Sequence, residues 1–216
     1  MIRTAIDNLR GELPAETRRA QAEAASIELV RLTRLFEDIL DMARIEAAAI
    51  PVARQWVSAA DVVDAALAHV RHAIDGHSLR VDADADRHVN IDARLAAVAL
   101  GHLIENAARY SPADREIVVD ATVDDSGIQM SVTDGGTGID PAELNHLFER
   151  FYRGQRAQRT TPGTGMGLAI ARGLLDAIGG RVSAENIDGE GARFSIVIPG
   201  VVRRHAVEAC PCRSAS

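Results

Sequence analysis

Lysine is absent from this chain of 216 residues, and arginine supplies all 24 of its basic side chains. That absence excludes any chemistry that uses a lysine amine as the nucleophile. The 31 acidic residues outnumber the arginines and leave a net charge of −7. Because contacts to phosphate backbones require a basic surplus, we expect no nucleic-acid partner.

Cysteines and long apolar runs are also scarce. The two cysteines, Cys210 and Cys212, lie in the last seven residues, too few for a zinc site or a disulfide framework. No run approaches the roughly 18 apolar residues of a membrane span, and the N-terminus lacks the layout of a signal peptide. We therefore expect a reduced, cytoplasmic segment that makes no membrane contact. Its 47% apolar and 25% charged residues are typical of a globular protein.

The first 50 residues predict a helical hairpin. A helical stretch at residues 2–13 is broken by Gly11 and Pro14. A second stretch at residues 15–49 contains neither glycine nor proline. At 1.5 Å per residue the arms would measure about 18 and 50 Å, so we expect a hairpin whose first arm is cut short by the start of the chain. The longer arm carries an apolar seam that requires partner helices, although a single helix lying on a globular domain would also explain it. The seam consists of Leu29, Leu32, Phe36, Ile39 and Ala43.

After Pro51 the pattern changes to mixed helices and strands. This order predicts an α+β domain, a two-layer α/β sandwich with helices on one face of a mixed sheet. Residues 200–216 are expected to form a disordered tail. Helices are expected at residues 59–74, 93–110, 141–147 and 167–179, and strands at residues 54–57, 79–81, 89–91, 117–123, 128–133, 182–186 and 192–198.

Four segments indicate one nucleotide site. The first lies on the helix at residues 93–110, where Asn106, Arg109 and Tyr110 are three to four residues apart and share a face. An amide oxygen can ligate Mg²⁺, a guanidinium can pair with phosphate, and a phenol ring can flank a base. Taken alone, this pattern also fits an ordinary amphipathic helix whose core face holds Leu103 and Ala107.

The second segment, residues 134–139, directly follows a predicted strand. A carboxylate at a strand end, Asp134, can accept a hydrogen bond from an exocyclic amine. The glycines beside it let the backbone approach a base or phosphates closely. A plain turn is the alternative, and the recurrence of glycine next to an acid weakens it.

The third segment, residues 161–168, opens a predicted helix. Glycines at 163, 165 and 167 expose main-chain N–H groups, which form an anion site at a helix N-terminus. Without a Gly-Lys-Ser/Thr sequence this cannot be a Walker loop. Its place in the chain also excludes the dinucleotide fingerprint, whose glycines follow the first strand of a βαβ unit.

The fourth segment, residues 147–153, gathers Phe148, Phe151 and Tyr152 ahead of a polar stretch. Such a cluster is typical of a hinged lid with an apolar anchor. A plain surface loop would not require these aromatic residues together.

In this order and spacing, the four segments resemble the nucleotide-binding boxes of the histidine-kinase ATP-binding domain, which has the GHKL or Bergerat fold. Residues 31–46 resemble the later part of the dimerisation and histidine-phosphotransfer hairpin of these kinases. Gln55, Trp56 and residues 184–194 are most similar to the Kdp-type osmosensing sensor kinases. The resemblance therefore covers almost all of residues 1–199.

The resemblance implies three parts: a partial hairpin at residues 1–50, a catalytic ATP-binding domain at residues 51–199, and the tail at residues 200–216. It implies a sensor histidine kinase of a two-component system that binds Mg·ATP. The γ-phosphoryl group would pass to a histidine, for relay to an aspartate of a response-regulator receiver domain. The intact kinase would be a homodimer through the hairpin, located in the cytoplasm or as the cytosolic part of a membrane-anchored sensor.

The resemblance also implies a role for each site residue. Asn106 would ligate Mg²⁺, Arg109 would contact phosphate, and Tyr110 would pack near the adenine. Asp134 would accept a hydrogen bond from the exocyclic amine of adenine. The glycines would shape the adenine wall, the phosphate loop and the lid hinge, and two phenylalanines would anchor the lid. The expected ATP-binding residues are Asn106, Arg109, Tyr110, Asp134, Gly136, Gly138, Ile139, Phe148, Phe151, Gly163, Thr164, Gly165, Met166, Gly167 and Leu168.

Two departures from the family pattern stand out. All seven histidines lie outside residues 1–50, and the phosphoacceptor box, a His followed by Asp/Glu-Leu-Arg-x-Pro, is absent. By the family's pattern the acceptor would precede Met1, so we assign no catalytic residue and expect no normal autophosphorylation by this chain. His102 stands where many members have an asparagine. It either alters the metal side of the site or is a tolerated polar residue, and we favour the second interpretation.

Two other functions are open. The first is a GHKL protein of another class, a serine kinase of the anti-sigma type or an ATPase. Such proteins typically lack the long hairpin that residues 29–46 resemble. The second is a non-catalytic ATP-binding and dimerisation module.

Overall fold

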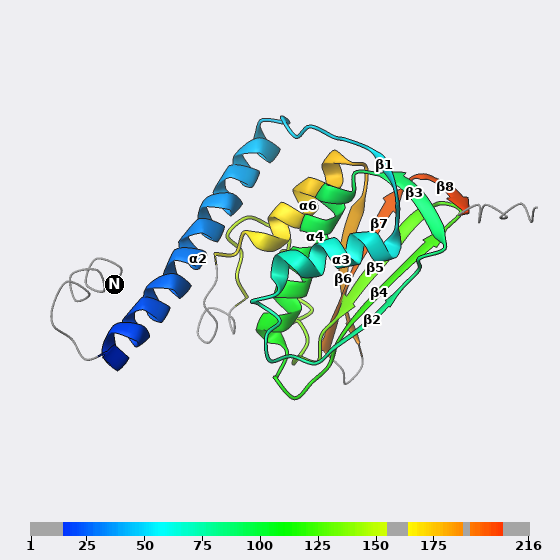
Figure 1. Ribbon diagram of the computed structural model, residues 1–216. Helices are drawn as coiled ribbons and strands as arrows, with labels where there is room; N and C mark the ends of the chain where they lie inside the picture. The colour runs from blue at the N-terminus through cyan, green and yellow to red at the C-terminus, as the bar shows by residue number, and fades with distance from the viewer. Residues whose placement is uncertain (1–14, 155–163, 188–190, 205–216) are drawn as a thin grey trace, which may run out of the picture. The chain divides into compact units, whose positions relative to one another are not determined.

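The computed structural model describes residues 15–154, 164–187 and 191–204. The chain divides into two compact units, Met1–Ala47 and Ala48–Ser216. In the first unit the structure describes helix α2 (Ala15–Glu46), drawn in blue in Figure 1. The shorter arm expected at residues 2–13 lies outside the described residues. None of the described helices has the length and apolar character needed to cross a membrane.

Helix α2 agrees with the expected long arm and ends slightly earlier. The chain leaves the helix where Ala48 adopts a left-handed φ of 48°, ahead of Pro51. Its predicted seam is exposed, with Phe36 accessible over 62% of its surface. An apolar stripe of this length is typical of a helix that packs against further helices.

The second unit contains the predicted two-layer α/β sandwich. Its main sheet has the order β2-β4-β5-β7-β6, in which β2 runs parallel to β4 and the other pairs are antiparallel. Helices α3, α4 and α6 cover one face of this sheet (Figure 1). The prediction of a mixed sheet with helices on one face is therefore confirmed. The bounds are β2 (Leu79–Ala83), β4 (Ile117–Asp124), β5 (Gly127–Thr133), β6 (Arg181–Ile187), β7 (Gly191–Pro199), α3 (Ala59–Val70), α4 (Ala93–Tyr110) and α6 (Gly167–Ala177).

The core follows from strict alternation along the central strands. Ile117 and Val119 of β4 are buried, while Val118 between them is more accessible. On β7, Phe194 and Ile196 point to the same apolar layer, and Leu103 of α4 is fully buried. Because side chains alternate between the faces of a strand, one face of the sheet becomes the floor for the helices. Burying each such side chain stabilises the fold by about 1.5–3 kcal/mol.

Helix α4, which carries the first predicted segment, is fixed at both ends. Asp92 Oδ1 accepts a hydrogen bond from the N–H of Leu95 (3.0 Å), and Oδ2 accepts one from Ala53 (2.7 Å). At the other end the Ser111 N–H donates to the Ala107 carbonyl at 2.8 Å. Pro112 then prevents further helix. These caps confirm the predicted start and end of the helix and set the position of its polar face.

A second, three-stranded antiparallel sheet shows that the predicted tail starts too early. It has the order β1-β3-β8, with β1 (Gln55–Ser58), β3 (Arg87–Ile91) and β8 (Val201–Arg204). The expectation of disorder from residue 200 is therefore wrong for residues 201–204. The physical reason is pairing of Val202 with the buried Val89, together with stacking of the Arg203 guanidinium on Trp56 at 4.2 Å. Residues 205–216 lie outside the described residues.

Two expected helices also differ from the structure. Helix α3 ends at Val70, and turns replace the expected helix at residues 71–74. Residues 141–147 form consecutive turns with i→i+3 hydrogen bonds, such as Glu143 N–H to Asp140 C=O (2.8 Å). Asp140 Oδ1 also accepts the N–H of Ala142 at 2.9 Å. The expected helix is replaced because the backbone here closes i→i+3 turns.

Candidate functional site

Asp134 directly follows β5 and is 4% exposed. Its main-chain N–H donates to the carbonyl of Ala192 on β7 at 2.9 Å. Its Oδ1 accepts two hydrogen bonds, from the N–H groups of Gly136 (2.9 Å) and Ala192 (3.3 Å). Within the part of the chain that the structure describes, Oδ2 receives no hydrogen bond. The carboxylate is thus oriented by the backbone, with Oδ2 as the remaining acceptor for a ligand.

Burial raises the pKa of Asp134, while the hydrogen bonds from Gly136 and Ala192 act in the opposite direction. A carboxylate that is removed from water and has few donors makes a strong hydrogen bond to a ligand N–H. This is the electrostatic setting that the predicted contact to an exocyclic amine requires.

Two glycines around Asp134 leave no room for a side chain. Gly191, at φ +93°, would place a Cβ 2.2 Å from the Asp134 carbonyl oxygen and 2.7 Å from its Oδ1. A Cβ on Gly136 would lie 2.8 Å from the Tyr110 carbonyl oxygen and 2.9 Å from Asp134 Oδ1. Gly191 is missing from the expected site residues. Its sequence signal is only a glycine next to a hairpin turn, and its role depends on the pairing of β5 with β7.

Side chains from two other elements hold the 134–139 loop. Ser111, at the end of α4, accepts the N–H of Gly135 through Oγ at 2.9 Å. Asn186 on β6 accepts the N–H of Ile139 through Oδ1 and donates through Nδ2 to the Ile139 carbonyl, both at 2.7 Å. Neither side chain is among the expected site residues. Nothing in the local sequence identifies them, because each contact joins distant parts of the chain.

The C-terminal end of helix α4 lies against this loop. Leu103 and Ala107 are fully buried, as predicted, and Asn106 is half-buried. Arg109 is exposed, and Tyr110 is 40% exposed. The Tyr110 carbonyl lies against Gly136, because a Cβ added to Gly136 would be only 2.8 Å from the Tyr110 carbonyl oxygen. The end of α4 and the carboxylate at the end of β5 therefore border one another.

The third predicted segment leads into α6. Gly165 adopts φ +71°, and a Cβ there would lie 2.8 Å from the Tyr152 carbonyl oxygen. Gly167 opens α6 beside His102 of α4, whose Nδ1 would lie 3.3 Å from an added Cβ. Met166 is buried and Thr164 exposed. Leu168 is half-buried, and Gly163 lies outside the described residues.

The start of α6 has the features of an anion site. Met166 occupies the N-cap position, and no side chain caps the helix. The first N–H groups of a helix have no partner within the helix and carry the positive end of its dipole. A phosphate group is the kind of ligand that such an end binds.

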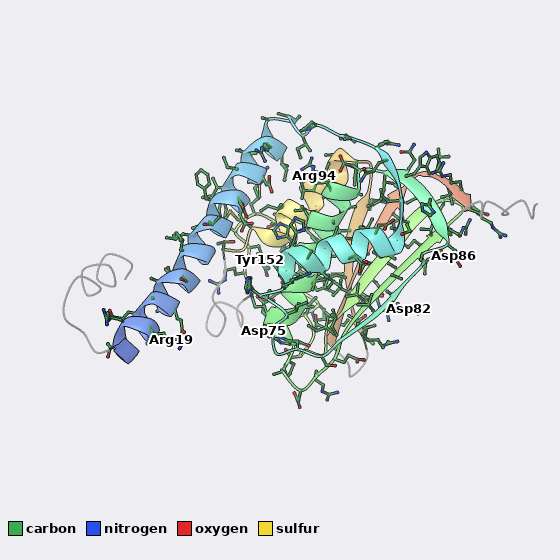
Figure 2. The ribbon with its side chains drawn as sticks, viewed as in Figure 1. Arg19, Asp75, Asp82, Asp86, Arg94 and Tyr152 are labelled. Carbon is green, nitrogen blue, oxygen red and sulfur yellow. The ribbon has the colours of Figure 1, made fainter. Side chains whose placement is uncertain are left out.

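The fourth segment lies within the connection from β5 to α6 and includes Tyr152, which Figure 2 labels. The Tyr152 ring lies 5.8 Å from the ring of His146. Phe148 is half-buried. Phe151 has a left-handed φ of 60° and is 68% exposed. A residue with positive φ turns the chain sharply, and here the turn directs Phe151 outward.

No cluster of three or more His, Cys, Asp or Glu side chains in the described ranges could hold a metal ion. The resemblance would place a cation on the amide oxygen of Asn106, with water and the phosphates of a nucleotide as its other ligands. Mg²⁺ in nucleotide sites is commonly held in this way, through few protein ligands and several phosphate or water oxygens. The available donors fit Mg²⁺ better than a metal that prefers thiolate or imidazole.

An open hollow lies beside β8, lined by Arg87, Asp125 and residues 200–204. Asp125 lies in the turn before β5, whereas Asp134 follows its end. The hollow is therefore at the opposite end of this strand and contains none of the expected site residues. Geometry and chemistry favour the surroundings of Asp134 as the candidate site.

Comparisons with known proteins identify the family of this domain. Residues 91–201 match the family described as histidine kinase-, DNA gyrase B-, and HSP90-like ATPase. Sensor protein KdpD of Escherichia coli (strain K12) is 32% identical over 179 residues, which cover 83% of this chain and 20% of that protein. Sensor-like histidine kinase SenX3 of Mycobacterium tuberculosis (strain ATCC 25618 / H37Rv) is 29% identical over 194 residues, covering 88% of this chain and 47% of that protein. The chain thus spans between a fifth and about half of these relatives.

Solved structures give the same result. The mycobacterial sensor histidine kinase MprB matches with a TM-score of 0.58 and 28% identity, covering 69% of this chain and 99% of that one. Full-length ShkA, solved in complex with AMPPNP, matches with a TM-score of 0.71 and 25% identity over 91% of this chain and 41% of that one. The resemblance to the ATP-binding domain of sensor histidine kinases is confirmed. The chain belongs to the family of histidine kinase-, DNA gyrase B-, and HSP90-like ATPases.

Proposed function

We propose that this chain is the catalytic ATP-binding region of a sensor histidine kinase. It binds Mg·ATP and transfers the γ-phosphoryl group to a histidine on a phosphotransfer helix. The observation that carries the proposal is Asp134, a buried carboxylate at the end of β5. Its Oδ1 accepts the backbone N–H groups of Gly136 in the glycine-rich loop and of Ala192 on β7. In this proposal residues 1–50 are the partial hairpin, and the catalytic domain extends from residue 51 through β8.

The adenine end of the site is built by the 134–139 loop. Asp134 accepts the exocyclic amine of adenine through Oδ2, because two backbone N–H groups already occupy Oδ1. Gly136, Gly138 and Ile139 form the wall beside the base. A site that hydrogen-bonds one edge of a base discriminates strongly against ligands that lack the matching group.

The phosphate end is built by α4 and by the start of α6. Asn106 provides an amide oxygen for Mg²⁺, Arg109 pairs with phosphate, and Tyr110 packs beside the base. The N–H groups from Gly165 to Leu168 receive phosphate oxygens. When bound, Mg²⁺ neutralises charge on the phosphates. Phosphoryl transfer needs little covalent help from a protein, so positioning by these groups is the main contribution.

The reaction balances with an acceptor histidine. The bond between the γ-phosphorus and the oxygen that remains on ADP breaks, and a bond forms from the γ-phosphorus to an imidazole nitrogen. The nitrogen that attacks is the unprotonated one, and the proton on the other ring nitrogen leaves to a base beside the acceptor; we assign no such base in this chain. A response-regulator receiver domain then accepts the phosphoryl group on an aspartate. In the intact kinase the apolar seam of α2 contributes to a homodimer, and the region lies in the cytoplasm.

The test is a transfer experiment in trans. Purified chain is incubated with γ-labelled ATP, Mg²⁺ and a separate hairpin fragment that contains an acceptor histidine. We expect acid-labile label on the fragment and none on this chain. Label on serine would support a GHKL serine kinase, and nucleotide binding without transfer or hydrolysis would support a binding module. Calorimetry with Mg²⁺ and a non-hydrolysable ATP analogue measures binding directly, and the absence of heat would contradict the proposal.

A further inference from the structure

Asn186 makes a two-point contact to the backbone of a single residue in the 134–139 loop. Its Oδ1 accepts the N–H of Ile139 and its Nδ2 donates to the Ile139 carbonyl, each over 2.7 Å. Both groups of one side-chain amide therefore satisfy both polar groups of one peptide residue. A two-point contact of this kind fixes orientation as well as distance.

The loop needs such support because its own sequence does not restrict it. Gly138, next to Ile139, adopts φ +74°, and a Cβ there would lie 3.0 Å from Asn186 Oδ1. Glycine populates many backbone conformations, so a loop rich in glycine loses much entropy when it is held in one shape. The close approach of Gly138 and the amide contact at Ile139 together place this end of the loop against β6.

The other end of the loop is held by β7. Asp134 exchanges hydrogen bonds with Ala192, and Gly191 lies too close to Asp134 to carry a side chain. Strands β6 and β7 pair with each other, with Asn186 opposite Ala192. One pair of residues across this ladder thus contacts both ends of the loop.

We propose that Asn186 is a positioning residue for adenine recognition, which holds Ile139 so that the 134–139 loop keeps its shape while Asp134 contacts the base. This inference rests on the proposed function. Asn186 lies on β6, outside the loop that forms the adenine wall, and acts through Ile139. Its effect concerns the adenine end of the site and is independent of how many phosphates the ligand carries.

The first measurement needs no nucleotide. Hydrogen exchange at the Ile139 amide is compared between the unmodified chain, Asn186→Ala, and the control Gln129→Ala. Gln129 is an exposed amide on β5 of the same sheet, whose Nε2 donates to Asp124 Oδ2 at 2.6 Å near the opposite end of the strand. We expect faster exchange at Ile139 in Asn186→Ala alone. Unchanged protection of Ile139 in that variant would overturn the inference.

The second measurement is calorimetry with Mg²⁺ and either ADP or a non-hydrolysable ATP analogue. Asn186→Ala should raise the Kd of both ligands by the same factor, about three- to tenfold, because hydrogen bonds that order the loop are lost. The binding stoichiometry and the melting temperature should stay near those of Gln129→Ala. A merely structural role would instead lower the stoichiometry or the melting temperature and leave the Kd of the folded fraction unchanged.

Asn186→Asp provides the conservative comparison. The carboxylate can still accept the Ile139 N–H, but it places an oxygen against the Ile139 carbonyl where an N–H now donates. We expect at least as large a loss of affinity as with alanine. Full retention of affinity in either variant would overturn the inference. If the unmodified chain binds no nucleotide, the proposed function fails, whereas the exchange measurement still decides whether Asn186 holds Ile139.

Discussion

The N–H of Gly135 donates to the Oγ of Ser111 at 2.9 Å. This hydrogen bond joins the end of α4 to the loop that follows β5, two elements that carry different halves of the proposed site. Ser111 is mostly buried and has a second role, since its own N–H ends α4 by donating to Ala107. The polar face of α4 and the carboxylate of Asp134 are thus kept in register by one small hydroxyl group.

Ser111→Ala should therefore reduce both stability and nucleotide affinity. Without the hydroxyl, a partly buried Gly135 N–H loses its acceptor, and we expect a loss of about 1 kcal/mol in the free energy of unfolding. Denaturant unfolding measures this loss, and calorimetry with Mg·ATP analogue measures the affinity. Ser111→Thr retains the hydroxyl and should recover most of both. Equal behaviour of the alanine and threonine variants would show that the hydroxyl has no such role.

Gly191→Ala should be far more harmful than Gly76→Ala. Both glycines have positive φ, +93° and +84°, so a side chain is strained at each. At Gly76 an added Cβ meets nothing within 4 Å, whereas at Gly191 it lies 2.2 Å from the Asp134 carbonyl oxygen. We expect about 1–2 kcal/mol of destabilisation at Gly76 from backbone strain, and clearly more at Gly191.

Denaturant unfolding of the two variants checks this difference. Because the backbone strain is similar, the difference between them reports the collision with Asp134. Similar losses of unfolding free energy in both variants would contradict the tight packing that the structure shows around Asp134.

Local patterns were sufficient to predict most of the fold. The strands expected at residues 117–123 and 192–198 correspond to β4 and β7, and the helix expected at residues 93–110 has the bounds of α4. The pattern failed where contacts between distant segments decide the structure. Strand β8 forms because Val202 pairs with Val89 of β3. Turns with i→i+3 hydrogen bonds replace the helix predicted at residues 141–147.

The candidate site shows the same division. The glycines and Asp134 are recognisable because they form motifs within short segments. Other elements support these motifs through Ser111, Asn186 and Gly191. The hydrogen bonds from the loop to Ser111 and Asn186, and from Ala192 beside Gly191 to Asp134, join residues that are 24 to 58 positions apart in the sequence. A single sequence contains no signal for pairings at that distance. The structure therefore identifies mainly the residues that position the site, whereas the expected ligand-binding residues were already recognisable in the sequence.

Arg203→Ala should weaken the small sheet and change the fluorescence of Trp56. The guanidinium lies 4.2 Å from the centre of the ring, and Trp56 is the single tryptophan of the chain. A cation–π contact at an accessible site contributes about 0.5–1 kcal/mol. We expect a loss of that size in denaturant unfolding and a shift in tryptophan emission. Arg204→Ala, on the same strand, is the control; identical spectra for the two variants would argue against the contact.

Asp134→Asn should stabilise the protein and impair adenine binding. Burial raises the pKa of Asp134, so the folded state disfavours its ionised form, and this cost is present when the pH is above the raised pKa. The neutral asparagine removes the cost, and we expect a higher melting temperature at neutral pH. As the pH falls through the raised pKa towards the ordinary value, Asp134 gains its proton and the difference between the two proteins should vanish.

Binding should change in the opposite direction. Because Gly136 and Ala192 both donate to the position of Oδ1, the asparagine is oriented with its oxygen there and its NH₂ group in the position of Oδ2. A donor would then face the amine of adenine, and we expect affinity for adenine nucleotides to fall by roughly tenfold or more. Preference for adenine over guanine nucleotides should decrease as well, since the NH₂ group suits a carbonyl acceptor. Asp124→Asn is the control with the opposite expected effect on stability. Hydrogen bonds from Ser126 lower the pKa of Asp124, so the ionised carboxylate stabilises the fold at pH values above its ordinary pKa. Removing this charge should lower the melting temperature at neutral pH and leave nucleotide binding unchanged.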